Sequence, residues 1–355
     1  MRALLTLFFA LLWLSAEACS SAVVARSHSK EAGVILWKHR DQSSINDCRI
    51  AYYDDGKYAY TALVHSYIRI GESTLAGVNE CGFGYVSTAT SHLKRQPKEV
   101  HPASKQQLMC RALRECRTVE EFEALLAVHK RYPSFEMNVC VGDAEGGAAV
   151  FEIWSDGYRK YDVTSFDVRT NFSFAATSEK RGGSVRRYET VMEQMQGRND
   201  FTAQDFFGYS RSFYSAQKGD ILKSDSRYRD NNYTVPRYTS VASVVIVCSE
   251  NPRIDAIVGH PVAGMSVPVW VAAGHNIPKC VAGRAMYDLG RAFKAKAYTK
   301  EGDKVYLNKD VARKVVAINH NIKAPHRMPT DIVKFNTKVD LIFEKHRQQI
   351  MKILE

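Results

Sequence analysis

Segments with the composition of β-strands and segments with helical spacing come in alternating blocks along this 355-residue chain. The strand-like runs are rich in β-branched and aromatic residues. They are residues 21–26, 33–40, 58–70, 75–90, 136–141, 147–154, 158–161, 167–171, 240–248 and 254–258. Regular alternation of one strand with one helix is typical of parallel sheets, whereas blocks of strands favour antiparallel sheets covered by helices. We therefore predict an α+β layered fold.

Helical patterns separate the groups of strands. They cover residues 104–114, 184–196, 202–207, 284–297, 308–319 and 331–354. Another helix is expected after Thr118, because Thr118 and Glu121 form the capping box that often begins a helix. The chain shows no internal repeat and no low-complexity linker. We expect one domain over residues 19–355, with a helical C-terminal extension from about residue 281 to which no function is assigned.

The first eighteen residues have the pattern of a signal peptide. Arg2 is followed by an apolar stretch over residues 3–14, interrupted only by Thr6, and residues 16–18 form the small-x-small motif that signal peptidase recognises. We therefore expect an exported protein, periplasmic or secreted, whose mature chain begins at Cys19. The alternative is lipoprotein processing, which also cuts before a cysteine. Ala16 stands where that enzyme requires a large aliphatic residue, so simple cleavage is favoured.

Composition limits the classes of partner. The net charge is +11 with a pI near 9.2, but the basic residues are spread out and do not form a stripe interleaved with aromatic residues. Nucleic-acid binding is therefore not expected. Outside the first eighteen residues no apolar run reaches the roughly 18 residues that a membrane span needs.

The cysteines do not have the spacing of a disulfide or metal framework. Of the eight, seven remain when Cys19 is set aside, and no C-x-x-C pair or Cys/His cluster is present. We expect no metal and no cofactor. Cys110 and Cys116 should not pair with each other, because they face different sides of one expected helix. The thiols of Cys81, Cys140 and Cys248 are expected to be buried as small hydrophobic groups.

A cysteine at a chain terminus carries its own base. The free α-amine has a reference pKa of about 7.7–8.0, so near neutral pH it can accept the proton of the thiol. The thiolate can then attack an amide carbonyl without help from a histidine. Cys19 opens a short β-rich segment, and the strand at residues 33–40 ends next to Asp41. A strand pair of this kind places the terminal cysteine and Asp41 close together.

The residues around Asp41 carry a resemblance to a known family. From Cys19 to about Tyr188 the chain resembles the choloylglycine hydrolase and penicillin V acylase group of N-terminal-nucleophile hydrolases. In that family the strand ends in Arg-Asn-x-Asp or Gln-Asn-x-Asp, and here the matching residues are Lys38-His39-Arg40-Asp41. The turn Gly77-Val-Asn-Glu-Cys-Gly82 matches the family's Gly-x-Asn-Glu-x-Gly. The resemblance implies that Asp41 orients the α-amine of Cys19.

Two further site residues follow from the resemblance. The order of strands and turns over residues 138–171 is similar to that of the family, and Asn171 matches the side chain that polarises the substrate carbonyl. Arg187 matches a supporting arginine, with Arg186 as the near alternative. At residues 87–89 the sequence Ser-Thr-Ala replaces an asparagine that helps to form the oxyanion hole of bile-salt enzymes. His260 and His275 are interpreted as loop or core polar groups.

The resemblance implies a four-layer αββα sandwich and hydrolysis of a linear carboxamide. The catalytic residues would be Cys19, Asp41, Asn171 and Arg187, the partner a small-molecule amide. Two alternatives stay open. The first is acyl transfer to an amine instead of water. The second is a lipid-anchored binding protein without catalysis, in which acylation blocks the amine. The acyl group, the amine and any homo-oligomer are not specified by the sequence.

Overall fold

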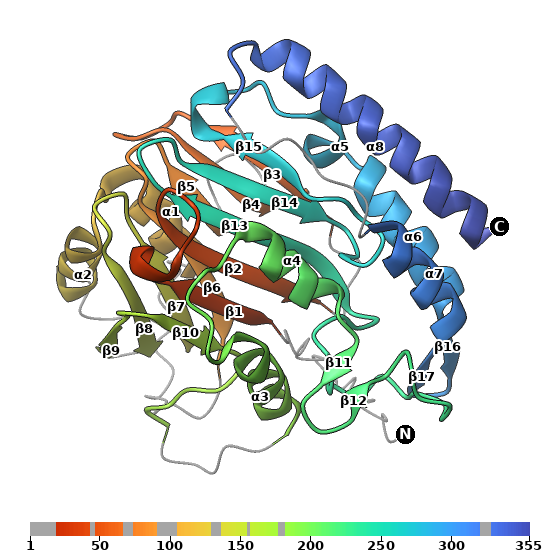
Figure 1. Cartoon of the computed structure of the whole chain (residues 1–355). Coiled ribbons are helices and arrows are strands. Elements are labelled where there is room, and N and C mark those ends of the chain that lie inside the picture. Colours follow the sequence, from red (N-terminus) through yellow and green to blue (C-terminus); the bar gives the residue numbers. More distant parts are fainter. Residues whose placement is uncertain are drawn as a thin grey trace, which may run out of the picture.

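Two stacked antiparallel sheets form the centre of the structure, a computed structural model that describes residues 19–42, 47–66, 74–90, 105–128, 136–154, 157–176, 182–319 and 328–355 (Figure 1). The proposed signal peptide, residues 1–18, lies outside the described residues. The six-stranded sheet has the order β10 (Phe166–Arg169), β1 (Ser20–Val24), β2 (Val34–Asp41), β13 (Ser240–Cys248), β14 (Arg253–Val258) and β15 (Val267–Trp270). Strands far apart in the sequence are therefore neighbours in this sheet.

The second sheet has seven strands in simple sequence order. They are β3 (Cys48–Tyr53), β4 (Tyr60–His65), β5 (Thr74–Asn79), β6 (Gly84–Ala89), β7 (Met137–Gly142), β8 (Ala148–Trp154) and β9 (Gly157–Asp162). Its inner face packs on the six-stranded sheet, with β1 and β2 against β6 and β7, and β13 against β5 and β6. Strands covered on both faces need apolar side chains on both, which explains the continuous run of buried residues in β13.

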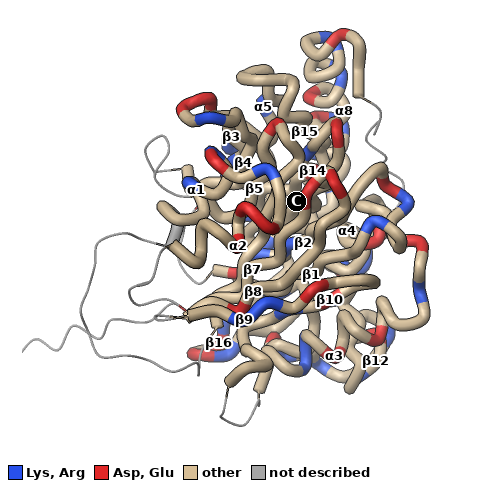
Figure 2. The backbone as a smooth tube through the Cα atoms, turned by 90° about the vertical axis from the view of Figure 1, so that its left-hand side faces the viewer, with Lys and Arg blue, Asp and Glu red and all other residues tan. Residues whose placement is uncertain are grey.

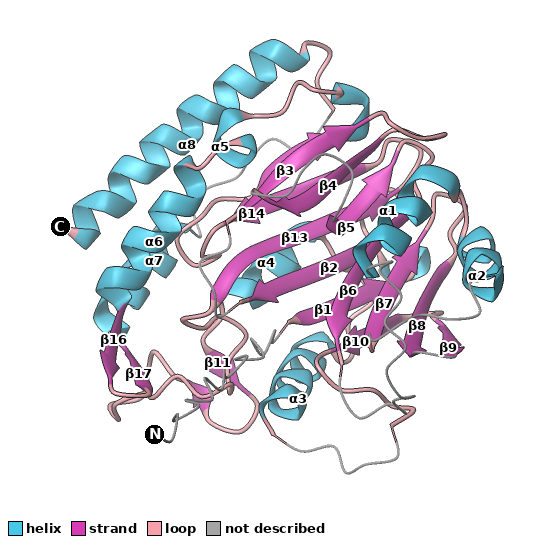
Figure 3. Cartoon of the chain, turned by 180° about the vertical axis from the view of Figure 1, so that it is seen from behind, coloured by secondary structure: helices cyan, strands magenta, loops and turns pink. Residues whose placement is uncertain are grey.

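Helices cover the two outer faces of the sheets. On the seven-stranded sheet lie α1 (Lys105–Glu115) and α2 (Val119–Val128), whose apolar side chains form a second core with it. On the six-stranded sheet lie α3 (Gly183–Met195) and α4 (Ala203–Arg211). The layers are visible from behind in Figure 3. The predicted α+β class and four-layer αββα sandwich are confirmed.

The C-terminal extension packs on one flank of the sandwich. It comprises α5 (Lys279–Ala282), α6 (Ala285–Ala297), β16 (Tyr298–Glu301), β17 (Lys304–Leu307), α7 (Lys309–Asn319) and α8 (Ile332–Leu354). The remaining short elements are β11 (Tyr214–Ser215), β12 (Gly219–Asp220) and 3-10 turns at Arg26–His28 and Val271–Ala273. Buried side chains such as Phe293, Val315 and Phe343 belong to the same apolar core as the six-stranded sheet. The extension therefore shares the core of the sandwich.

Several local expectations can be compared with the structure. Helix α2 begins after Thr118 as predicted, and the Oγ1 of Thr118 accepts a hydrogen bond from the N–H of Glu121 at 3.2 Å. The strand β3 was not predicted. All eight cysteines are free thiols, but Cys81 is half-buried where we expected a buried side chain, because its turn between β5 and β6 reaches the surface. Burial of Cys140 and Cys248 is confirmed.

Charged residues of both signs are interspersed along the backbone, as Figure 2 shows for one side of the molecule. Among the helices that the structure describes, none is both long and apolar enough to cross a membrane.

Candidate active site

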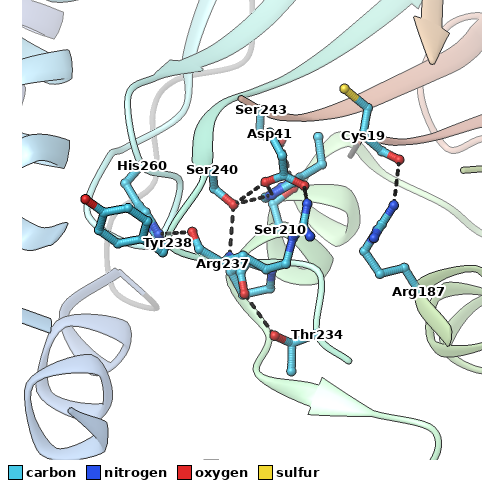
Figure 4. A network of polar contacts seen from close by, with 12 residues as sticks. Cys19, Asp41, Arg187, Ser210, Thr234, Arg237, Tyr238, Ser240, Ser243 and His260 are labelled. Atoms are coloured by element: carbon cyan, nitrogen blue, oxygen red, sulfur yellow. Dashed lines mark hydrogen bonds and ion pairs between the residues drawn. The ribbon is translucent and has the colours of Figure 1, made fainter. Parts of the chain in front are cut away.

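The pairing of β1 with β2 brings Cys19 to the end of β2. Ser20 lies opposite His39 in this antiparallel pair, so Cys19, one residue earlier, is beside the last residues of β2. Asp41 ends that strand, and both Cys19 and Asp41 are fully buried. The strand pair predicted from the sequence thus places these two residues in one buried region (Figure 4).

Asp41 is held by a network of hydrogen bonds. Its Oδ2 accepts from the Nη2 of Arg237 at 2.5 Å, and its Oδ1 accepts from the Oγ of Ser240 at 2.6 Å. The Nε2 of His39 lies 3.4 Å from the same Oδ1. Burial by itself raises the pKa of Asp41, but the charge of Arg237 and the contact with His39 outweigh it and lower the pKa well below its usual range. Asp41 is therefore an anion at neutral pH.

Arg187 of α3 is a buried cation between Cys19 and Asn171. Its Nη2 donates to the Oδ1 of Asn171 at 2.7 Å and to the carbonyl oxygen of Cys19 at 3.5 Å. Burial, with the like charge of Arg237, lowers the pKa of Arg187 to about 9, so the side chain remains charged at neutral pH. The neighbouring Arg186 instead stacks its guanidinium over the ring of Tyr233. Of the two arginines considered from the sequence, Arg187 is the one beside Cys19.

The amide of Asn171 is fixed at both ends. Its Nδ2 donates to the carbonyl oxygen of Ala89 at 2.8 Å, and its Oδ1 accepts from Arg187. The backbone on either side is fixed by buried Asn138, whose Nδ2 donates to the carbonyl oxygens of Thr170 and Phe172 at 2.9 and 3.0 Å. The Nδ2 of Asn171 has two hydrogens, of which Ala89 engages one. The other can be directed at a substrate oxygen.

Two of the departures from the family motifs, Lys38 and residues 87–89, meet at β6. The Nζ of Lys38, which is buried, donates to the carbonyl oxygen of Ser87, and the Oγ1 of Thr88 donates to the carbonyl oxygen of Thr170 at 3.3 Å. The segment 87–89, where the expected asparagine is missing, therefore contributes backbone oxygens that hold Lys38 and Asn171.

Sequence reasoning missed Arg237. It lies in the loop before β13, where its N–H donates to the Oγ of Ser240 at 2.9 Å. Its guanidinium is buried, and its charge interacts with the side chains of both Asp41 and Cys19. The charge of Arg187 also interacts with the Cys19 side chain. The only signal in the sequence is an arginine three residues before a serine that opens an apolar strand.

The chemistry available at this site is that of a nucleophile with nearby charges. Among the described residues, no group of three or more His, Cys, Asp or Glu side chains is arranged to hold a metal ion. A surface cavity of about 350 Å³ lies along the edge strand β3, with Tyr52 and His275 among its lining residues. None of the four predicted site residues lines that cavity, so it is separate from the candidate active site.

Solved structures similar to this chain include proteins named as a hydrolase, an acylase and an amidase. Conjugated bile acid hydrolase from Clostridium perfringens is 12% identical, with a TM-score of 0.46 and coverage of 72% of this chain and 93% of that chain. Penicillin V acylase from Agrobacterium tumefaciens is 15% identical, with a TM-score of 0.41 and coverage of 72% and 86%. The ortholog of N-acylethanolamine-hydrolyzing acid amidase from Caenorhabditis elegans is 13% identical, with a TM-score of 0.42 and coverage of 64% and 92%.

No protein-family model and no curated protein matches the chain.

Proposed function

We propose that this chain is an exported N-terminal-nucleophile amidase that hydrolyses a linear carboxamide, not a peptide bond, through an acyl-enzyme on Cys19. The observation that carries the proposal is the convergence of two buried groups on Cys19. Arg237, paired with Asp41, interacts through its charge with the Cys19 side chain, and Arg187, hydrogen-bonded to Asn171, donates to the Cys19 carbonyl oxygen. A buried cysteine that serves only for packing needs no such charges around it.

In the first half of the reaction Cys19 is acylated. Its α-amine takes the thiol proton, and Sγ attacks the carbonyl carbon of the amide. The carbonyl oxygen becomes an oxyanion, to which the Nδ2 of Asn171 donates, while the positive charge of Arg187 lies behind Asn171. The C–N bond then breaks, and the departing amine receives the proton from the α-amine. The product is a thioester on Cys19.

In the second half a water molecule attacks the thioester. The α-amine accepts a proton from the water, the C–S bond breaks, and the sulfur is reprotonated as the carboxylic acid leaves. An amine in place of water would give acyl transfer through the same thioester. Product analysis with and without an added amine separates the two reactions.

The lipid-anchored binding protein is less well supported. Residue 20 already lies in β1, which is paired on both sides, with β2 and β10. Acyl chains attached to Cys19 would have to pass out of the interior of the sheet.

The proposal is tested with the exported protein. Intact mass should give a chain that begins at an unmodified Cys19. The mature protein should release free amine from at least one of conjugated bile acid, penicillin V and N-acylethanolamine, the molecules in the names of the similar structures. Cys19→Ala should abolish the release and leave the urea unfolding midpoint nearly unchanged. The matched control is Cys280→Ala, a buried cysteine of α5, which should keep the activity.

A mature chain that carries acyl groups on Cys19 would contradict the mechanism, and so would full activity in Cys19→Ala.

A further inference from the structure

The loop between β14 and β15 is held by side chains from three helices. Its carbonyl oxygens accept hydrogen bonds from Arg211 of α4, Asn319 of α7 and His346 of α8. Arg211 donates to Pro261 at 3.1 Å and Gly264 at 2.9 Å, His346 donates to Ala263 at 2.8 Å, and Asn319 donates to Val262. These side-chain donors give four carbonyl oxygens of the loop a partner and so restrain its backbone. Two of the three donors belong to the C-terminal extension.

One residue of this loop, His260, reaches the candidate active site. Its ring is buried, and its Nε2 lies 2.9 Å from the carbonyl oxygen of Arg237. A carbonyl oxygen only accepts, so Nε2 is the nitrogen that carries the hydrogen. The other ring nitrogen, Nδ1, accepts from the N–H of Val262 at 3.3 Å. The neutral ring is therefore fixed in one tautomer, with both nitrogens engaged.

The C-terminal extension determines where His260 lies. Helix α6 packs directly on the loop, since a Cβ at Gly290 would lie 2.3 Å from the backbone nitrogen of His260. Gly259 has φ of +98° and faces the same helix, where a Cβ would lie 2.7 Å from the carbonyl oxygen of Met286. The ring of Phe293 lies 4.7 Å from that of His260, measured between centroids. Only glycine allows this approach of helix and loop.

The hydrogen bond from His260 fixes the backbone of the residue that holds Asp41. The carbonyl oxygen of Arg237 accepts from His260 and from the N–H of Ser240, the latter at 3.0 Å. The N–H of Arg237 and the carboxylate of Asp41 both contact the Oγ of Ser240. The guanidinium of Arg237 then donates to Asp41. Figure 4 shows this chain of contacts from His260 to Asp41.

We propose that His260 is a positioning residue, through which the C-terminal extension sets Arg237 and Asp41 against the amine of Cys19. The inference rests on the proposed function, since it assigns Asp41 the task of orienting that amine. It gives the helices after residue 280 a role in catalysis without contact with substrate.

Two substitutions at residue 260 separate the hydrogen bond to Arg237 from the loop contact. His260→Gln keeps a donor at about the position of Nε2 and should retain kcat and kcat/KM within about threefold. His260→Asn can still accept from the N–H of Val262, but its side chain is too short to reach Arg237. It should lower kcat by about 10- to 100-fold with little change in KM, since a small misplacement of catalytic groups has effects of this size.

The matched control is His346→Asn. It removes a buried histidine of α8 that contacts the same loop at Ala263 and has no hydrogen bond to Arg237 among the described contacts. It should lower the urea midpoint and leave kcat within about threefold of wild type. Gly290→Ala is a second route if His260→Asn does not fold, because its methyl group pushes on His260 from the side of α6. It should lower kcat in the same way.

A second readout does not depend on the substrate. The rate at which iodoacetamide alkylates Cys19, followed on its peptide by mass spectrometry, should fall in His260→Asn and recover in His260→Gln. If the wild type cleaves no amide, the proposed function fails and the alkylation rates still decide the inference. Equal rates in His260→Asn and wild type would overturn it, and so would an equal loss of activity in His346→Asn.

Discussion

The strength of the Asp41–Arg237 pair can be measured with a double-mutant cycle. The single variants are Asp41→Asn and Arg237→Met, and each leaves one partner buried without the other, since the side chains are 0% and 7% exposed. Removal of one partner from such a pair destabilises a protein by about 3–5 kcal/mol. Once one charge is gone, loss of the other costs little more. The double variant should therefore be about as stable as either single variant, with a coupling free energy of about 3 kcal/mol.

The assay is urea unfolding at pH 7 with linear extrapolation. Because the pKa of Asp41 in the folded protein is below its value of about 3.9 in the unfolded chain, its charge stabilises the protein above about pH 4. That contribution is lost as the pH falls through the folded-state pKa, so pH 7 measures it in full. The control cycle uses Lys30 and Asp200, 2.9 Å apart with 62% and 44% exposed side chains, where the coupling should be below about 1 kcal/mol. A coupling no larger than this control would refute the reasoning.

Three further predictions concern other buried groups. Asn171→Ala should lower kcat by about 10²- to 10³-fold with a small change in KM, as for loss of an oxyanion donor, and steady-state kinetics on the amide checks it. Glu152→Gln removes the charge that pairs with buried Arg169, 2.7 Å away, and should lower the free energy of unfolding by about 2 kcal/mol in urea titrations. Burial lowers the pKa of His346 to about 4, against about 6.5 unfolded, so the unfolded chain binds more protons as the pH falls from 6.5 to 4. This group should therefore cost the wild type up to about 3 kcal/mol of stability near pH 4, and His346→Gln should lose that part of the acid sensitivity; parallel stability profiles would contradict it.

The sequence was sufficient where local pattern determines structure. Cys19 and Asp41 were expected to meet because each lies at the end of a strand-like run, and the β1–β2 register places them so. Helix α8, expected at residues 331–354, extends over Ile332–Leu354. In both cases the spacing of apolar residues predicts the strand or helix, and a polar residue at its end marks the boundary.

The sequence was insufficient where a contact depends on tertiary structure. Arg237 is 196 residues from Asp41, in a loop with no periodic pattern, and only the β2–β13 pairing brings its neighbour Ser240 opposite Asp41. His260 was interpreted as a loop or core polar group, and it is buried as such a group would be. Its contact with Arg237 depends on the packing of α6, which no local pattern specifies. Strand β3 was missed because Arg49 and Ala51 interrupt it and leave Ile50 as its one β-branched residue.

In the proposed mechanism, the pairing of Asp41 with Arg237 would also let one carboxylate orient the base without weakening it. An isolated buried carboxylate beside the α-amine of Cys19 would stabilise the ammonium form and keep the amine from accepting a proton. Under the proposed function, the positive charge of Arg237, which is hydrogen-bonded to the same carboxylate, offsets the negative charge of Asp41 at the amine. Removal of Arg237 should therefore leave an amine that is deprotonated only at higher pH. Under the proposed function, the arginine missed by sequence reasoning would make Asp41 compatible with a terminal amine acting as the base.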